Sequence, residues 1–286
     1  MIIVLYDSVF ALEIKLIMKL IKQKSIPMLT QLVKDFTATR ELTEKLSIAL
    51  TPEDASAQSA TFASPAKWHL AHTSWFFEKF LLKHFCKNYC NFNDSFNHLF
   101  NSYYNSAGSV YSREHRGLLT RPSLDTVYEY RNHINKCIIK LLESCDRKLH
   151  SEVANRILLG INHEQQHQEL LLTDIKHLFW HNPLLPNYHL AKNDETLRSE
   201  PREWIEIGSG IYEAGADHEC VFAFDNETPN HRVFLNKYEI SSKTVTNKDY
   251  LDFIEDRGYQ NPMLWLSDGW NIKNNNGWDA PLYWSK

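Results

Sequence analysis

Residues 151–180 read SEVANRILLGINHEQQHQELLLTDIKHLFW, and their pattern predicts a long helix. Its apolar residues recur at three- and four-residue spacing, which is the pattern of an amphipathic helix with one face in a core. The same spacing predicts helices over residues 26–50, 65–85 and 123–149. Four such helices with short connections are typical of a bundle, so we expect a helical domain over residues 26–186.

Two of these helices carry start signals. Ser64 precedes Pro65, which predicts a serine N-cap before a proline at the first helical position, and Pro122-Ser123 opens the next helix. Between them, residues 91–121 are polar and aromatic, and the segment is longer than an ordinary connection. Loops of that length are often functional, so we expect this segment to contribute to a site.

The composition changes near residue 200. The last 86 residues hold six of the nine glycines and five of the eight tryptophans. Short apolar runs at residues 204–208, 231–235 and 238–240 alternate with Gly, Asn and Asp turns, which predicts strands, and one helix is expected over residues 247–256. Residues 201–286 therefore form a second, α+β domain of a multi-domain chain.

Charge and cysteine content exclude several classes of protein. The net charge of -4, from 31 basic and 35 acidic residues, leaves no strongly basic field for nucleic acid or an anionic membrane. Five cysteines are an odd number, which disfavours a disulfide framework and indicates a reducing compartment. Asp7, Glu13 and Lys15 interrupt the apolar N-terminal stretch, so it fits neither a secretory signal nor a membrane span. We expect a cytoplasmic protein.

The strongest local signal is a pair of histidines on the helix quoted first. His163 and His167 are four residues apart, so both imidazoles project from one helix face and can reach one ion at about 2 Å. Two unrelated histidines on a polar face are the alternative interpretation. Residues 163–167 also match HExxH, in which Glu164 would be the general base of a zinc metalloprotease, although no third ligand fits downstream.

A second histidine pair lies in the run SPAKWHLAHTSWFFE at residues 64–78. His69 and His72 are three apart, so one of them can face the bundle interior and the other its edge. If His72 faces the HxxxH pair, three neutral imidazoles bind one face of a metal ion and leave positions open for other ligands. By ligand type such a site suits Fe(II), Co, Ni or Zn, and the spacing does not choose among them.

Several runs together resemble a known family. Four of them lie at residues 64–78, 101–108, 113–123 and 162–175, and three more lie at residues 222–240, 245–259 and 264–284. The resemblance is to ergothioneine-type sulfoxide synthases (hercynine oxygenases), in which a DinB-like four-helix domain precedes a formylglycine-generating/sulfatase-modifying domain of C-type-lectin-like fold. The first four runs are similar to the helical domain, and the last three are similar to the second domain.

The resemblance implies a metal site and a reaction. One non-haem Fe(II) would be bound by His72, His163 and His167, with His69 in a packing or supporting role. The implied reaction uses O₂ to join the sulfur of cysteine or γ-glutamylcysteine to imidazole C2 of hercynine, giving a sulfoxide. Gln166 matches a position that hydrogen-bonds the hercynine ring.

The resemblance also identifies a pair of arginines that bind the sulfur donor. Arg113 and Arg116 match a pair that holds the donor's carboxylates, a task for which the guanidinium fork is well suited. The family's second domain extends further than residue 286, and the tyrosine that delivers a proton lies in that further part. We therefore expect a C-terminally truncated chain whose catalytic proton donor is not identified, and a separately encoded C-terminal half is one partner that would complete it.

Three alternatives remain open beside this reaction and the zinc metalloprotease. The chain could be an inactive remnant that binds a metal or a protein partner. It could instead be a histidine–thiol synthase of the ovothiol type, or a selenoneine synthase built on the same scaffold.

Overall fold

A computed structural model describes four parts of the chain: residues 29–104, 108–188, 201–217 and 220–284. The chain divides into two compact units. One contains the helical bundle together with Gly215–Asn230, and the other contains the rest of the chain after residue 192.

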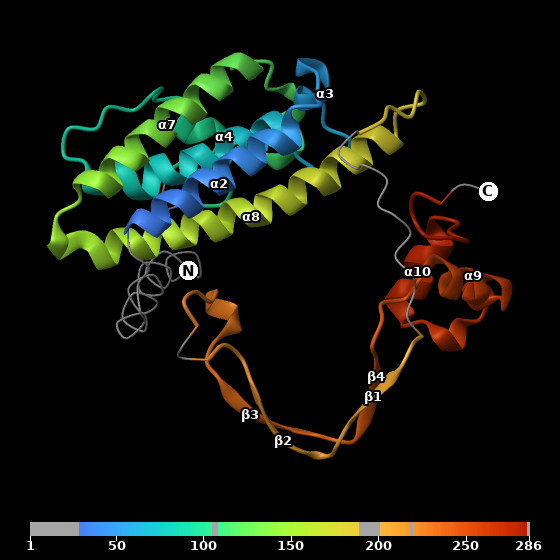
Figure 1. The fold of residues 1–286 in the computed structure, drawn as a ribbon. Coiled ribbons are helices and arrows are strands. Elements are labelled where there is room, and N and C mark those ends of the chain that lie inside the picture. The colour runs from blue at the N-terminus through green and yellow to red at the C-terminus, as the bar shows by residue number, and fades with distance from the viewer. Residues whose placement is uncertain (1–28, 105–107, 189–200, 218–219, 285–286) are drawn as a thin grey trace, which may run out of the picture. The chain divides into compact units, whose positions relative to one another are not determined.

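Four long helices form the first unit and lie alongside one another (Figure 1). This confirms the predicted DinB-like helical bundle. Shorter helices α3 (Pro52–Ser56), α5 (Lys83–Phe85) and α6 (Phe96–Leu99) connect them. The four long helices are α2 (Leu29–Ser47), α4 (Ala66–Phe77), α7 (Leu124–Ser144) and α8 (His150–Trp180).

The core of the bundle is apolar and draws on all four long helices. Phe36, Phe77, Ile134 and Ile157 are each fully buried in it, one from each helix. Burial of each such side chain contributes about 1.5–3 kcal/mol. Because α4 has every residue buried, it runs through the middle of this core and must carry its polar groups into contact with other helices.

The helix boundaries correct two expectations. Pro65 occupies the N-cap position of α4, and Ser64 does not cap it: the Ser64 N–H donates to Asp174 Oδ2 at 2.9 Å and its hydroxyl accepts from Arg116. The expected helix over residues 123–149 ends at Ser144, because Cys145 is extended and a separate 3₁₀ turn follows over Arg147–Leu149. The expected capping of the same helix by Ser123 is found, with its side chain accepting from Thr126 N–H.

The helix expected over residues 65–85 is also interrupted. Its α-helical geometry changes to a π-helical segment at Glu78–Leu82 before α5 completes the run. Glu78 is buried there, and its carboxylate accepts hydrogen bonds from the hydroxyls of Tyr89 and Tyr130. Single π-helical turns inside α-helices are often found near functional sites.

The second unit contains two antiparallel strand pairs. In the first, β1 (Trp204–Ile207) pairs with β4 (Tyr238–Ser241), so that Trp204 is opposite Ser241. In the second, β2 (Gly210–Ala214) pairs with β3 (His231–Leu235). The expected strands at residues 204–208, 231–235 and 238–240 are present, and β2 is an additional strand.

Helices complete the second unit. Helix α9 (Asn247–Glu255) is the expected one, with Thr246 and Asp249 forming a capping box at its start. A second helix, α10 (Ser267–Asn275), corrects the expectation of only one; its Gly- and Asn-rich sequence has low helix propensity. Among the described residues of this unit only Gly258 and Tyr259 are buried. The buried polar and charged side chains of the described residues therefore lie in the bundle.

None of the helices in the described ranges combines the length and the apolar character needed to cross a membrane.

Candidate metal centre

Three histidines from two helices come together inside the bundle. His72 projects from α4, and His163 and His167 project from α8 one turn apart, with one ring nitrogen of each lying within 4.8 Å of the others. The Nε2 atoms of His72 and His163 are 3.3 Å apart. Since metal–imidazole bonds are about 2 Å long, both atoms can bind one ion. The structure thus brings the two histidine motifs into one cluster, which we call the triad.

The triad is held in the protonation state that binds metals. Burial lowers the pKa of His163 to about 4 and holds the pKa values of His72 and His167 well below their usual range. All three imidazoles are therefore neutral at pH 7. Neutral imidazole is the ligating form, so these residues fit a divalent transition metal of the class expected from the sequence.

The ring of His72 is fixed in orientation and tautomer. Its Nδ1 lies 2.6 Å from the carbonyl oxygen of Phe100, which can only accept, so the ring proton is on Nδ1 and the lone pair is on Nε2. The ring is also stacked on Trp68 and Trp75, with centroid distances of 4.4 and 5.5 Å. The nitrogen facing His163 is therefore the one that is free to bind a metal.

The ring of His163 is stacked on Phe76, with a centroid distance of 4.3 Å. Its Nδ1 is buried and has no hydrogen-bond partner within the described part of the chain. A buried polar nitrogen without a partner costs free energy. Because Nε2 is the atom that faces His72, this Nδ1 is not the nitrogen that would bind the ion.

His69 lies beside the triad and contacts His167. Its Nδ1 is 2.9 Å from His167 Nδ1, and its Nε2 is 2.9 Å from Asp174 Oδ2. Burial lowers the pKa of His69, so the contact with Asp174 is a hydrogen bond from a neutral imidazole to a carboxylate. His69 therefore supports a member of the triad, which agrees with the supporting role that the resemblance implies.

Glu164 cannot act as the general base of a zinc protease. Its side chain is fully buried, and its carboxylate accepts hydrogen bonds from Arg40, Arg131 and Thr43. Burial alone would raise the pKa of Glu164, but the charges of the two arginines lower it below its usual value. A carboxylate with three donors in a closed core is not available to a metal-bound water, so the HExxH interpretation loses its catalytic residue.

Arg116 is stacked close to the triad. It lies on the 3₁₀ helix Arg113–Leu118, and its guanidinium carbon is 3.4 Å from the centroid of the Trp68 ring, the same ring that stacks on His72. It is only 2% exposed, and burial and the charge of Arg113 lower its pKa to about 9. Its Nε has no hydrogen-bond partner within the described residues, so this is a buried cation that is only partly satisfied.

The other two residues expected to bind substrate lie at the surface. Arg113 is exposed, and its backbone carbonyl accepts from Gln58 Nε2 at 2.8 Å. Gln166 is exposed on α8, next to His167. Arg113 and Gln166 therefore lie on the same elements as Arg116 and His167, but neither side chain is buried beside the triad.

The sequence patterns did not predict the buried charges beside the triad. Arg40 and Arg131 occupy apolar stripes of α2 and α7, where Phe36 and Ile134 are their neighbours one turn away. A charged residue inside an apolar stripe is itself a signal, because buried charges require partners. The signal does not say which residue is the partner, and Glu164 is more than 30 residues distant from both.

Two family models match the chain in succession. The DinB superfamily matches residues 35–171, and the Sulfatase-modifying factor enzyme 1-like domain matches residues 189–284. The first match contains the whole triad, and the second covers the described part of the strand-containing unit.

Curated relatives point to the same family. A hercynine oxygenase of Mycolicibacterium smegmatis is 29% identical over 148 residues, which is 51% of this chain and 34% of the relative. A hercynine oxygenase of Mycobacterium tuberculosis is 32% identical over 125 residues, covering 43% of this chain and 29% of the relative. Ergothioneine biosynthesis protein 1 of Neurospora crassa is 25% identical over 167 residues, which is 54% of this chain and 19% of the relative.

The matched segments thus span about a third of the length of the two hercynine oxygenases. The order of the two matched domains is the order expected for hercynine oxygenases, and the named relatives are hercynine oxygenases as well. The chain has a DinB-type helical domain followed by a sulfatase-modifying-factor-like domain, and it is similar to the ergothioneine sulfoxide synthases.

Proposed function

We propose that this chain holds Fe(II) through His72, His163 and His167 and acts in the O₂-dependent carbon–sulfur coupling step of ergothioneine synthesis. The observation that carries the proposal is the triad itself: three neutral imidazoles from two helices with their ligand atoms within 4.8 Å. The choice of Fe(II) over Co, Ni or Zn is supported by the similarity to hercynine oxygenases, since the ligand set alone admits all four.

The proposed reaction balances without another reductant. A thiol S–H and the imidazole C2–H of hercynine lose their hydrogens, a C–S bond forms, and the sulfur gains one oxygen atom. One O₂ accepts the four electrons, giving the sulfoxide oxygen and one water. When bound, Fe(II) supplies a place where the donor sulfur and O₂ meet and can exchange electrons.

The residues around the triad bind and orient the substrates. Arg116 is a buried cation with an unsatisfied Nε, which favours an anionic ligand, and the carboxylate of cysteine or γ-glutamylcysteine is such a ligand. Arg113, on the same 3₁₀ helix, adds a second positive charge for that carboxylate. Gln166, next to His167, has an amide suited to the imidazole ring of hercynine.

A product assay tests the proposal. The chain is purified without oxygen, loaded with Fe(II), and mixed with hercynine, air and either cysteine or γ-glutamylcysteine. We expect O₂ uptake only when both substrates are present, and a product whose mass is that of the hercynine-derived sulfoxide. His163→Ala should abolish O₂ uptake, and Arg116→Gln should raise the KM for the sulfur donor more than the KM for hercynine.

Other outcomes identify the alternatives. Metal uptake with no O₂ consumption would indicate an inactive metal-binding protein. A product derived from histidine itself would indicate an ovothiol-type enzyme, and a selenium-containing product made only with a selenium donor would indicate a selenoneine synthase.

A further inference from the structure

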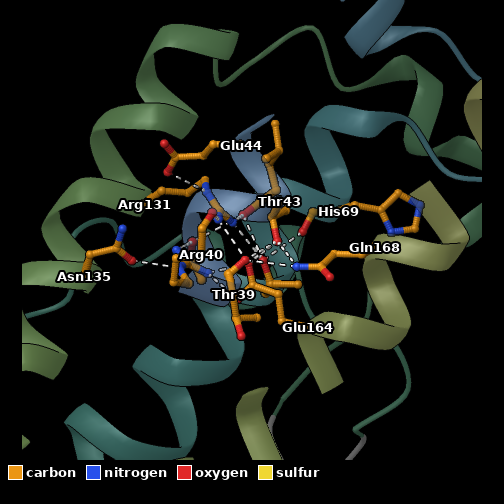
Figure 2. A network of polar contacts seen from close by, with 12 residues as sticks. Thr39, Arg40, Thr43, Glu44, His69, Arg131, Asn135, Glu164 and Gln168 are labelled. Carbon is orange, nitrogen blue, oxygen red and sulfur yellow. Dashed lines mark hydrogen bonds and ion pairs between the residues drawn. The ribbon is translucent and has the colours of Figure 1, made fainter. Parts of the chain in front are cut away.

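One carboxylate in the bundle core is shared by two arginines. Glu164 Oε2 accepts from Arg40 Nη1 at 2.9 Å, and Glu164 Oε1 accepts from Arg131 Nη2 at 3.0 Å. None of the three residues is more than 1% exposed. Figure 2 shows their side chains pointing toward one another from α2, α7 and α8.

A threonine links this ion group to a second position on α8. Thr43 Oγ1 donates to Glu164 Oε1 at 2.7 Å and accepts from Gln168 Nε2 at 2.9 Å. Gln168 also donates to the backbone carbonyl of Thr39 at 2.9 Å. Helix α2 therefore holds α8 at two points one turn apart (Figure 2).

The same ion group reaches α4. Thr73 Oγ1 accepts from Arg131 Nη1 at 2.9 Å, and Arg40 Nη2 donates to Ser74 Oγ at 2.7 Å. All four long helices are thus joined through one buried network. We call its side chains the Glu164 cluster: Arg40, Thr43, Thr73, Ser74, Arg131, Glu164 and Gln168.

Each histidine of the triad is followed directly in sequence by a residue of this cluster. Successive residues on a helix point about 100° apart, so the direction of one side chain fixes the direction of the next. A helix whose cluster residue is tied to two or three partners can neither rotate nor slide without breaking those bonds. The three pairs are His72-Thr73, His163-Glu164 and His167-Gln168.

Stability alone does not account for the cluster. Two guanidinium groups against one fully buried carboxylate leave an excess positive charge in the core. A second carboxylate, that of Glu44, lies 3.3 Å from Arg131 Nε, but it is one-third exposed and so does not balance that charge within the core. Buried ion groups of this kind can often be replaced by apolar residues with no loss of stability, and the best-attested reason for a polar group in a core is to fix register.

We propose that the Glu164 cluster is a positioning element for the metal centre, which sets the rotation and register of α4 and α8 so that the three imidazoles converge on one ion. The inference rests on the proposed function only in taking the triad as a metal site. Its residues act through the histidines and are positioning residues, not catalytic ones.

Matched hydroxyl deletions test the proposal, with Co(II) alone as the probe. Thr43→Val removes one hydroxyl that donates to the buried Glu164. Tyr130→Phe removes one hydroxyl that donates to Glu78 Oε2 at 2.5 Å, in a second buried carboxylate group that includes no neighbour of the triad. For each variant the Kd for Co(II), the visible absorption spectrum of the bound ion, and the urea unfolding midpoint are measured.

We expect Thr43→Val to weaken Co(II) binding roughly 10-fold and to shift the visible spectrum. This is the lower end of the loss caused by removing a residue that hydrogen-bonds a metal ligand, because Thr43 acts on the histidines only through Glu164 and Gln168. Tyr130→Phe should leave Kd and spectrum unchanged even where it lowers the unfolding midpoint as much. Glu164→Gln and Glu78→Gln make the same comparison with a larger change, because each removes the negative charge of one buried carboxylate. If Glu164→Gln does not fold, the comparison of Thr43→Val with Tyr130→Phe still tests the proposal.

The two failures are distinguishable. If the wild-type chain binds Co(II) tightly and Thr43→Val binds it equally well with the same spectrum, the positioning role is overturned while the metal site stands. If Thr43→Val and Tyr130→Phe weaken binding in proportion to their loss of stability, the cluster is only structural. If the wild-type chain binds no Co(II), the proposed metal site fails as well.

Discussion

His69 and His167 face each other through their Nδ1 atoms, which are 2.9 Å apart. The Asp174 carboxylate accepts a hydrogen bond from His69 Nε2–H, and burial keeps His69 neutral, so its Nδ1 can only accept. The proton between the two histidines therefore belongs to His167. This leaves the lone pair of His167 on Nε2, so Asp174 and His69 together select the tautomer that can bind a metal.

Removing the acceptor on His69 should weaken metal binding. His69→Phe keeps a planar ring in the buried position but offers no acceptor to His167, and loss of such a partner lowers metal affinity about 10- to 100-fold. Asp174→Asn keeps an oxygen that accepts from His69, so its effect should be smaller. Chelator competition with Co(II) measures both, and equal affinity of His69→Phe and wild type would show that the contact does not set the tautomer.

The metal-free protein should lose stability in mild acid. The pKa of His163 falls from the ordinary 6.5 to about 4 in the folded chain. Between these two pH values the unfolded chain therefore binds a proton at His163 that the folded chain does not bind. Stability is therefore lost as the pH falls from 6.5 toward 4, by about 3 kcal/mol for His163 over the whole window. His72 and His167 act in the same direction.

Urea unfolding of the metal-free chain at a series of pH values between 7.5 and 4.5 measures this dependence. His163→Gln should show a shallower loss of stability with acid than wild type, because one of the buried neutral bases is gone. A free energy of unfolding that stays constant, or rises, from pH 7.5 to pH 5 would contradict the neutral, buried state of the triad.

Gly160 should be needed for the close packing of α4 and α8. A Cβ at Gly160 would lie 2.3 Å from Phe77 Cε1, and Phe77 is fully buried in the core. Gly160→Ala should therefore destabilise the bundle by about 1–3 kcal/mol, although alanine is favoured over glycine in a helix by about 1 kcal/mol. Thermal unfolding measures this change.

Gly269 in α10 is the matched control for that substitution. A Cβ there meets only Trp265 Cε3 at 3.6 Å, an ordinary contact, so Gly269→Ala should cause no loss of stability. A Gly160→Ala variant as stable as wild type would show that α4 and α8 do not pack as closely as the structure has them.

The sequence predicted the parts of the site that depend on local spacing. The HxxxH pair follows from helix periodicity, since His163 and His167 are one turn apart on any helix. Whether His69 or His72 faces that pair could only be stated conditionally, because a three-residue spacing puts both on neighbouring faces. The packing of α4 against α8 decides it, and that packing depends on contacts such as Gly160 with Phe77.

Other features could not be predicted because their partners are distant in sequence. Ser64 has the sequence context of an N-cap, but its N–H and hydroxyl are used by Asp174 and Arg116 instead. Arg40 meets Glu164 across 124 residues, and no local pattern links the two. Tertiary contacts of this kind override local propensity, and they are the contacts that shape the site.

An anaerobic Fe(II) titration tests whether the three histidines of the triad form the metal centre. We expect the wild-type chain to bind one equivalent of Fe(II), and His163→Ala to bind none. His177→Ala removes another buried histidine of the same helix α8, outside the triad, and should retain the full equivalent. Failure of the wild-type chain to bind Fe(II), or Fe(II) binding that His163→Ala leaves intact, would contradict the assignment of His72, His163 and His167 as the metal centre.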